Sequence, residues 1–271
     1  MDELSPLDRL TAEIRSSAKY RALDEGLVRR VGAQELEKGR SFKEAVKAAR
    51  SKLHQVAGAY QEQGPDIPRA LAELQTLPAD RHDPAVRDYC RRLLARHAST
   101  AERLPYIEDF YTRVLDGLGP IHSLLDLGCG LNPLALPWMP LDGRVEYTAS
   151  DVYPEIAGLL SAFFEHVGQG GRGQVCDLTA EIPGQAVDAV LALKIIPCLE
   201  QLDKSIGRRL LNGLNAKVIV VSFPARSLGG RDKGMPAFYE GHLRELLAGK
   251  DWPVETISFG NETVYRIHKA G

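Results

Sequence analysis

The sequence lacks the features that would place a chain in a membrane or outside the cell. No apolar run reaches the roughly 18 residues that a membrane span requires, and the start, Met1-Asp2-Glu3, lacks the basic-then-apolar pattern of a secretion signal. The cysteines are few and scattered, with no C-x-x-C pair, which argues against disulfides and zinc ligands. We therefore expect a soluble, cytoplasmic protein. The cysteines are Cys90, Cys129, Cys176 and Cys198.

Several catalytic patterns are missing as well. The 7 histidines show no metal-ligand spacing, and no serine–histidine–acid or paired-carboxylate arrangement is evident. We therefore expect no metal site and no hydrolytic centre of these kinds. The 271 residues, 44% of them hydrophobic, suffice for one core of ordinary size and a smaller unit.

The net charge of -2 hides an uneven distribution along the chain. Between residues 9 and 54, 12 Lys and Arg stand against 6 Asp and Glu, whereas residues 101–271 are acidic. A basic front on an acidic body favours contact with a polyanion through the front. Because the excess is modest, a solvated helical surface is the plainer alternative.

The stretch from residue 123 to residue 133 carries the strongest local signal. A continuous apolar run ends at Gly128 and Gly130, which predicts a buried strand followed by a sharp turn. Asp126 lies at the carboxyl end of this strand, and Asp151 follows a second strand-like run. An acid in the position of Asp151 can accept hydrogen bonds from the ribose of a nucleotide-like cofactor. Pro133 stands near the third glycine of the dinucleotide pattern, so a purely structural turn also fits.

Strand and helix alternate after residue 121, which predicts a parallel sheet with right-handed crossovers. Two β-type runs around Gly260-Asn261 then predict an antiparallel hairpin. This α/β, Rossmann-like sheet with a C-terminal hairpin favours an S-adenosylmethionine-dependent methyltransferase over a nicotinamide domain, which would continue with parallel strands. We predict strands at 121–127, 145–150, 173–176, 186–193, 217–223, 254–259 and 262–268, and helices at 133–138, 154–167, 200–214 and 236–248.

The first hundred residues predict helices with basic outer faces. Ser5, Asp24 and Ser41 are suitable starts for three short helices. Prolines interrupt residues 64–84, and a further helix is expected at 83–97. The run Ser99-Thr100-Ala101-Glu102 has the pattern of a capping box and predicts the start of the next helix beside the cofactor pocket. We expect a helical domain at 1–97 and a methyltransferase domain at 98–271.

Three further features lie near the expected pocket. Asp177, after the third strand, can accept from an adenine amino group, and Lys194, after the fourth, faces the pocket mouth. Their plainer roles are a turn cap and a strand end. The loop from residue 226 to residue 235 holds three cations and three glycines, which suits phosphate binding. A solvated surface loop is the alternative for that segment.

These motifs together resemble the aminoglycoside-resistance 16S ribosomal RNA methyltransferases, in particular the branch that methylates guanine N7 at decoding-site position 1405. The similarity spans nearly the whole chain apart from residues 61–90. The matching stretches are Lys19-Tyr20-Arg21, Val28-Arg29-Arg30, Leu53-His54, Gly58-Ala59-Tyr60, His97-Ala98-Ser99-Thr100, Glu102-Arg103, Gly130-Leu131-Asn132-Pro133, and Ser222-Phe223-Pro224 with Arg226-Ser227-Leu228-Gly229-Gly230-Arg231 to Gly234-Met235.

The resemblance implies S-adenosylmethionine as cofactor, 16S rRNA in the 30S subunit as partner, a monomer, and aminoglycoside resistance as the outcome. Arg103, with Ser99 or Thr100, would hold the methionine carboxylate, Asp151 the ribose and Asp177 the adenine. The implied cofactor-binding residues are Ser99, Thr100, Arg103, Asp126, Gly128, Gly130, Asn132, Asp151, Asp177, Leu178 and Lys194. The implied RNA-binding residues are Lys19, Arg21, Arg29, Arg30, Arg50, Lys52, Arg226, Arg231, Lys233 and Met235.

The implied chemistry requires no general base, because guanine N7 is an unprotonated lone pair at neutral pH. Two departures from the family pattern occur, at Ala101, where some relatives carry lysine, and at Asp232 inside the basic loop. Two other functions stay open at this point. One is methylation of a small molecule or a protein, and the other is RNA binding without catalysis.

Overall fold

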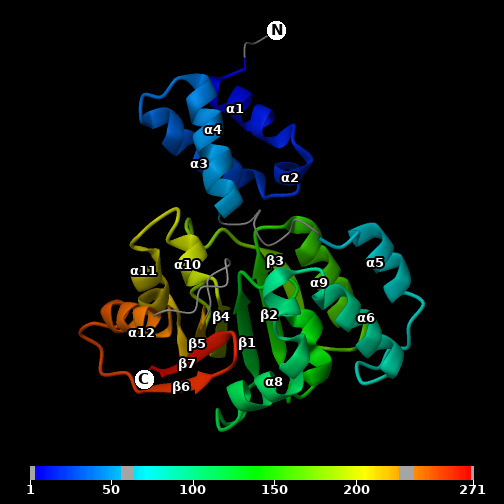
Figure 1. The fold of residues 1–271 in the computed structure, drawn as a ribbon. Helices are drawn as coiled ribbons and strands as arrows, with labels where there is room; N and C mark the ends of the chain where they lie inside the picture. The colour runs from blue at the N-terminus through cyan, green and yellow to red at the C-terminus, as the bar shows by residue number, and fades with distance from the viewer. Residues whose placement is uncertain (1–3, 56–63, 226–234, 270–271) are drawn as a thin grey trace.

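The computed structural model describes residues 4–55, 64–225 and 235–269, and these form a small helical unit above a larger α/β body (Figure 1). Ser5, Asp24 and Ser41 cap helices through their side chains, and Ser41 forms a full capping box with Glu44, as predicted. The short α2 was not predicted, because four residues carry no periodicity. The helices of the unit are α1 (Pro6–Arg15), α2 (Ala18–Arg21), α3 (Glu25–Glu37) and α4 (Phe42–Leu53).

Seven strands of the described chain form one sheet in the order β3-β2-β1-β4-β5-β7-β6. Strands β1 to β5 pair in parallel. Strand β7 pairs antiparallel with β5, and β6 pairs antiparallel with β7 at the side of the sheet. The predicted α/β fold with a C-terminal antiparallel hairpin is confirmed. The strands are β1 (Ser123–Leu127), β2 (Glu146–Asp151), β3 (Gly171–Val175), β4 (Val187–Leu193), β5 (Ala216–Pro224), β6 (Val254–Ser258) and β7 (Glu262–His268).

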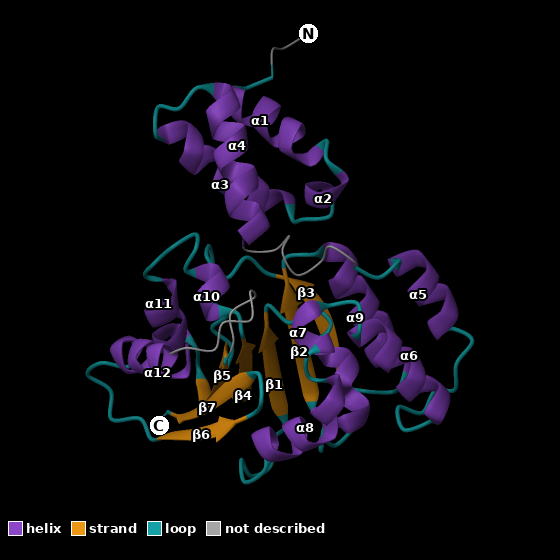
Figure 2. Ribbon diagram, in the orientation of Figure 1, coloured by secondary structure: helices purple, strands orange, loops and turns teal. Residues whose placement is uncertain are grey.

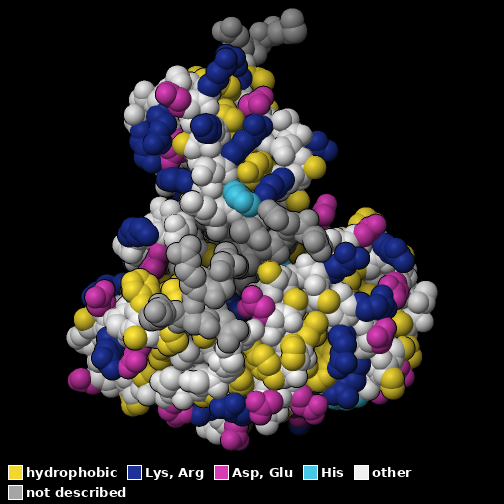
Figure 3. Space-filling view, in the orientation of Figure 1, with side chains coloured by type: hydrophobic (Ala, Val, Ile, Leu, Met, Phe, Trp, Pro, Cys, Tyr) yellow, Lys and Arg dark blue, Asp and Glu magenta, His cyan; other side chains and the backbone are white. Residues whose placement is uncertain are grey.

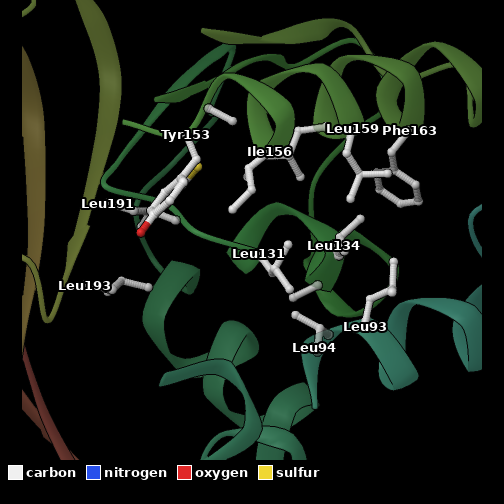
Figure 4. Packing of buried hydrophobic residues seen from close by; sticks show 14 of the residues in the cluster. Leu93, Leu94, Leu131, Leu134, Tyr153, Ile156, Leu159, Phe163, Leu191 and Leu193 are labelled. Carbon is white, nitrogen blue, oxygen red and sulfur yellow. The ribbon is translucent and has the colours of Figure 1, made fainter. Parts of the chain in front are cut away.

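Helices cover both faces of the sheet (Figure 2), because successive strand residues point to opposite sides. Leu124 packs into the core on one side, whereas Leu125 packs into the core on the other. Figure 4 shows part of the first core, where Leu131 and Leu134 meet Ile156 and other side chains. The covering elements are α8 (Ile107–Leu115), η3 (Asn132–Trp138) and α9 (Pro154–His166) on one side, and α10 (Ile196–Leu199), α11 (Ile206–Gly213) and α12 (Met235–Leu246) on the other.

Helix α5 (Ile67–Leu74) contacts α9, and helix α6 (Pro84–Leu94) contacts η3. Both lie beside the sheet in Figure 1. The expected boundary at residue 97 groups them with the first four helices instead. Within the described residues, no helix combines the length and the apolarity that crossing a bilayer would require.

Two local predictions were wrong. The helix expected at 200–214 begins only at Ile206, as α11, because residues 203–205 form a turn in which Asp203 accepts hydrogen bonds from the backbone N and the Oγ of Ser205 at 2.9 and 2.7 Å. The expected capping box is absent because α7 (Ala98–Ala101) has His97 as its N-cap, two residues before Ser99, so that Ser99 and Thr100 lie inside the helix.

Candidate functional site

A cavity opens at the edge of the sheet where the parallel strands have their carboxyl ends. The arrows of β1 and β3 point toward the helical unit above (Figure 2). Ligands bind at this edge in open α/β sheets, where the strand order reverses. Six residues expected at the cofactor site line the cavity: Ser99, Gly128, Asp151, Asp177, Leu178 and Lys194.

The glycine turn after β1 brings the backbone close to its neighbours. Gly128 and Gly130 have φ of +55° and +50°, the left-handed region that glycine tolerates best. A Cβ on Gly128 would lie 2.4 Å from the side chain of Ile195, and one on Gly130 would lie 2.8 Å from that of His97. The turn therefore requires glycine at both positions, for conformation and for space.

Asp151 ties this turn to the end of β2. Its carboxylate accepts hydrogen bonds from the backbone N–H groups of Gly130 and Val152, each at 2.7 Å. Burial raises the pKa of Asp151, and these hydrogen bonds partly oppose the rise. The carboxylate is held in one orientation at the cavity wall, where the sequence placed a ribose acceptor.

Asp126 and Asn132 are buried next to the same turn but do not line the cavity. Asp126 accepts from the side-chain amide of Asn132 at 2.7 Å and from the hydroxyl of Tyr147 at 2.8 Å. Burial raises the pKa of Asp126 to about 6, against the lowering effect of the two hydrogen bonds. Both residues hold the turn in place, and direct contact of either with a cofactor stays a prediction.

Arg103 is fully buried and forms a two-nitrogen ion pair with Glu262 on β7. Its Nε and Nη2 lie 2.8 and 2.7 Å from the carboxylate oxygens, and Nη1 donates to the side-chain oxygen of Asn132 at 3.2 Å. Burial acts to raise the pKa of Glu262, but the charge and hydrogen bonds of Arg103, together with the charge of Lys194 and a hydrogen bond with Ser222, lower the pKa overall. Arg103 does not line the cavity, so its role at the methionine carboxylate stays a prediction.

Glu262 is the main residue of this site that sequence reasoning missed. It lies 159 residues from Arg103 in the chain, and the available signal was an acid directly after the Gly260-Asn261 turn, at the start of a predicted strand. Thr100 is also outside the cavity lining, because its hydroxyl donates to the carbonyl oxygen of Leu94 at 2.6 Å.

Lys194 follows β4 with a φ of +58°, an uncommon conformation for a residue with a side chain. Its Nζ lies 2.5 Å from Glu102 and 3.6 Å from Glu262, so two carboxylates hold the ammonium at the cavity wall. His97 lies at the same wall, and burial followed by the charges of Arg103 and Lys194 lowers its pKa to about 4. The imidazole is therefore neutral at pH 7.

The predicted RNA-binding cations of the helical unit take part in contacts within the protein. Arg29 pairs with Asp8 at 2.6 Å, Arg50 contacts Glu13, and Arg21 donates to the carbonyl oxygen of Ser16 at 3.1 Å. Arg30 pairs with Asp177 in the body. Lys19 is exposed, and Met235 is the first residue of α12. Arg226, Arg231 and Lys233 lie outside the described residues.

A cation cluster around Glu35 was not predicted. The carboxylate of Glu35 is fully buried in α3 and pairs with Lys38 at 2.6 Å, with Lys52 at 2.8 Å, and with Arg40. Burial and repulsion by Lys38, Arg40 and Arg30 lower the pKa of Lys52 to about 8. The sequence signal was an acid on the apolar stripe that begins at Leu27, since positions four apart share a helix face. Figure 3 shows Lys and Arg side chains gathered over this unit.

The structure and sequence both match known ribosomal RNA methyltransferases. A structure of the 16S rRNA methyltransferase RmtF with S-adenosyl-L-homocysteine shares 31% identity, covers 99% of this chain and 100% of its own, and has a TM-score of 0.84. The 16S rRNA methylase RmtB shares 28% identity, covers 97% and 98%, and has a TM-score of 0.79.

Curated relatives agree with the solved structures. The 16S rRNA (guanine(1405)-N(7))-methyltransferase of Micromonospora echinospora is 33% identical over 97% of both chains, and that of Frankia casuarinae is 34% identical over 97% of this chain and 94% of its own. The family model FmrO, described as ribosomal RNA methyltransferase, matches residues 15–267. The resemblance predicted from the sequence is confirmed, and the chain belongs to the FmrO family of ribosomal RNA methyltransferases.

Proposed function

We propose that this protein transfers the methyl group of S-adenosylmethionine to N7 of guanine 1405 in 16S rRNA of the 30S subunit, and that this confers aminoglycoside resistance. The observation that carries the proposal is the match over 97% of the chain to enzymes named for this reaction. The cavity at the carboxyl edge of the sheet supports the cofactor assignment.

The residues around the cavity fit S-adenosylmethionine. The cavity is lined by apolar side chains such as Leu178 and Leu193 together with a few polar groups, as small-molecule sites typically are. Gly128 forms part of the cavity wall, and the fixed carboxylate of Asp151 suits the two ribose hydroxyls. Asp177 and Leu178 would hold the adenine end. Arg103, if it shares its guanidinium with Glu262, would face the methionine carboxylate.

When bound, the cofactor supplies a methyl group on a positively charged sulfonium, which is a good leaving group. Guanine N7 has a free lone pair, so the side chains have no proton to remove. The residues of the cavity act by holding donor and acceptor in line, an effect that can contribute several kcal/mol. The neutral imidazole of His97 keeps a further positive charge away from the cofactor end of the site.

The RNA must approach from the side of the helical unit. N7 lies in the deep major groove of an RNA helix, which side chains enter poorly, so the target base would have to turn out of its stack. The amino-terminal helical domain, expected at 1–97, would bind phosphates. Arg226, Arg231, Lys233 and Met235 would act near the target nucleotide. The protein would work as a monomer on 30S subunits in the cytoplasm.

Bacteria that express the protein should therefore grow at an aminoglycoside concentration that stops control cells. Asp151→Ala should abolish the protection, because it removes the acceptor of two backbone N–H groups and of the ribose. Protein levels must be equal in both strains. Sensitive cells that contain folded wild-type protein would contradict the proposal.

A further inference from the structure

The helical unit contributes one wall of the cofactor cavity. Leu27 of α3 is buried and lines the cavity beside Tyr153 and Leu202. At the start of the same helix, the backbone N–H of Asp24 donates to the carbonyl oxygen of Val152 at 2.8 Å. Val152 follows Asp151, so α3 is attached next to the expected ribose acceptor.

A second attachment lies at the expected adenine end. Arg30 of α3 donates from Nε and Nη2 to one carboxylate oxygen of Asp177, at 2.9 and 2.6 Å. The other oxygen accepts from the backbone N and the Oγ1 of Thr179, at 3.0 and 2.7 Å. These four contacts, two on each oxygen, fix the orientation of the Asp177 side chain.

The far half of α3 carries the Glu35 cluster. The helix begins at Glu25 and ends at Glu37, and it therefore joins the cavity wall to Lys38, Arg40 and Lys52 through one rigid element. Arg30 lies between the two ends, and its charge is among the causes of the low pKa of Lys52. A change in the position of α3 must therefore affect the cavity and the cations together.

We propose that Arg30 is a positioning residue of the cofactor site. Through Asp177 it holds the adenine end of the cavity and keeps Leu27 of α3 in the cavity wall, so that cofactor binding and RNA docking strengthen each other. This rests on the proposed function. Arg30 thus has a role at the cofactor cavity, through Asp177, whereas the sequence predicted that it binds RNA. By thermodynamic linkage, a cofactor that favours this position of α3 tightens subunit binding by the same factor as the subunit tightens cofactor binding.

The first test is titration calorimetry with S-adenosylmethionine in the absence of RNA. Arg30→Met should raise the Kd about tenfold, and Arg30→Lys, which keeps the charge but loses the two-nitrogen contact, should raise it about threefold. Arg15→Met is the matched control. Arg15 of α1 pairs with Glu25 of α3, and neither residue lines the cavity, so this variant should leave the Kd unchanged. The double variant Asp177→Asn with Arg30→Met should have a Kd little higher than that of the weaker-binding single variant, since the two substitutions remove the same interaction.

The second readout separates positioning from a general structural role. Wild-type protein should bind 30S subunits at least fivefold more tightly with S-adenosylhomocysteine than without it, and Arg30→Met should reduce that ratio toward one. Unchanged cofactor Kd for both Arg30 variants would overturn the inference and leave the proposed function intact. Failure of the wild-type protein to bind S-adenosylmethionine would instead overturn the proposed function. Should Arg30→Met not fold, Arg30→Lys decides the result.

Discussion

The helical unit and the α/β body bury carboxylates in opposite ways. In the helical unit, Glu35 is buried beneath cations whose side chains reach the surface. In the body, Asp126 and Asp151 accept from neutral donors, and Glu262 is paired with an arginine that is itself fully buried. The body thus fixes groups around a cavity, whereas the helical unit presents positive charge outward. The difference is consistent with the proposed cofactor site in the body and the proposed RNA contact of the helical unit.

The largest effect should come from the buried pair in the body. Glu262→Gln leaves Arg103 without a carboxylate partner and Lys194 with Glu102 alone, and removal of one partner of a buried ion pair typically costs about 3–5 kcal/mol. The free energy of unfolding from urea denaturation measures the loss. The double variant Arg103→Met with Glu262→Met should lose less than Glu262→Gln alone. A single variant as stable as wild type would contradict the contrast between the regions.

The next effect should appear in the pH dependence of stability. Because the pKa of Asp126 is raised from 3.8 to about 6, the folded protein keeps this proton at a pH where the unfolded chain has lost it. The contribution of Asp126 to stability is therefore present below its unfolded pKa and is lost as pH rises through about 6, by on the order of 2–3 kcal/mol. Asp126→Asn should remove this fall, as urea denaturation across the range would show. Parallel curves for the two proteins would contradict it.

A smaller loss of stability is expected in the helical unit. Glu35→Gln should cost about 1–2 kcal/mol, less than a fully buried pair, because Lys38, Arg40 and Lys52 can turn into water. Removal of a negative charge should by simple attraction tighten RNA binding. If Glu35 holds the cations in a productive arrangement, 30S binding should instead weaken in spite of the gained positive charge. Filter binding at several salt concentrations distinguishes the two.

The smallest effect should come from an exposed pair. Arg244 and Glu240 lie four residues apart on α12, with side chains 77% and 51% exposed. Such pairs contribute roughly 0.3–0.5 kcal/mol. Arg244→Ala should therefore shift the free energy of unfolding by no more than this. A loss as large as that of Glu262→Gln would show that burial does not govern these contributions.

Much of the fold could be predicted from the sequence, because its signals are local. Apolar runs ending in glycine, and the Gly260-Asn261 turn, place the strands within a few residues of their observed bounds. Competing local contacts defeated two predictions. The Oγ of Ser99 lies 2.9 Å from Nδ1 of His97 rather than capping a helix, and the turn from Asp203 to Ser205 delays the start of α11 to Ile206.

The site was only partly predictable, because its key contacts join distant parts of the chain. Asp151 and the glycine turn could be predicted, because both stand at the ends of recognisable strands. Arg103 was found, but its partner Glu262 lies 159 residues away. Arg30 and Asp177 were each singled out for separate roles, and their ion pair spans 147 residues. No periodicity or spacing encodes pairings of this kind.

The most direct test of the account is to map the methylated base. Purified protein is incubated with 30S subunits and S-adenosylmethionine, and the RNA is then reduced, cleaved with aniline and read by primer extension. The account predicts a new stop at guanine 1405 of 16S rRNA that requires the cofactor and is absent with Asp151→Ala. Folded wild-type protein that produces no such stop, or a stop elsewhere, would contradict it.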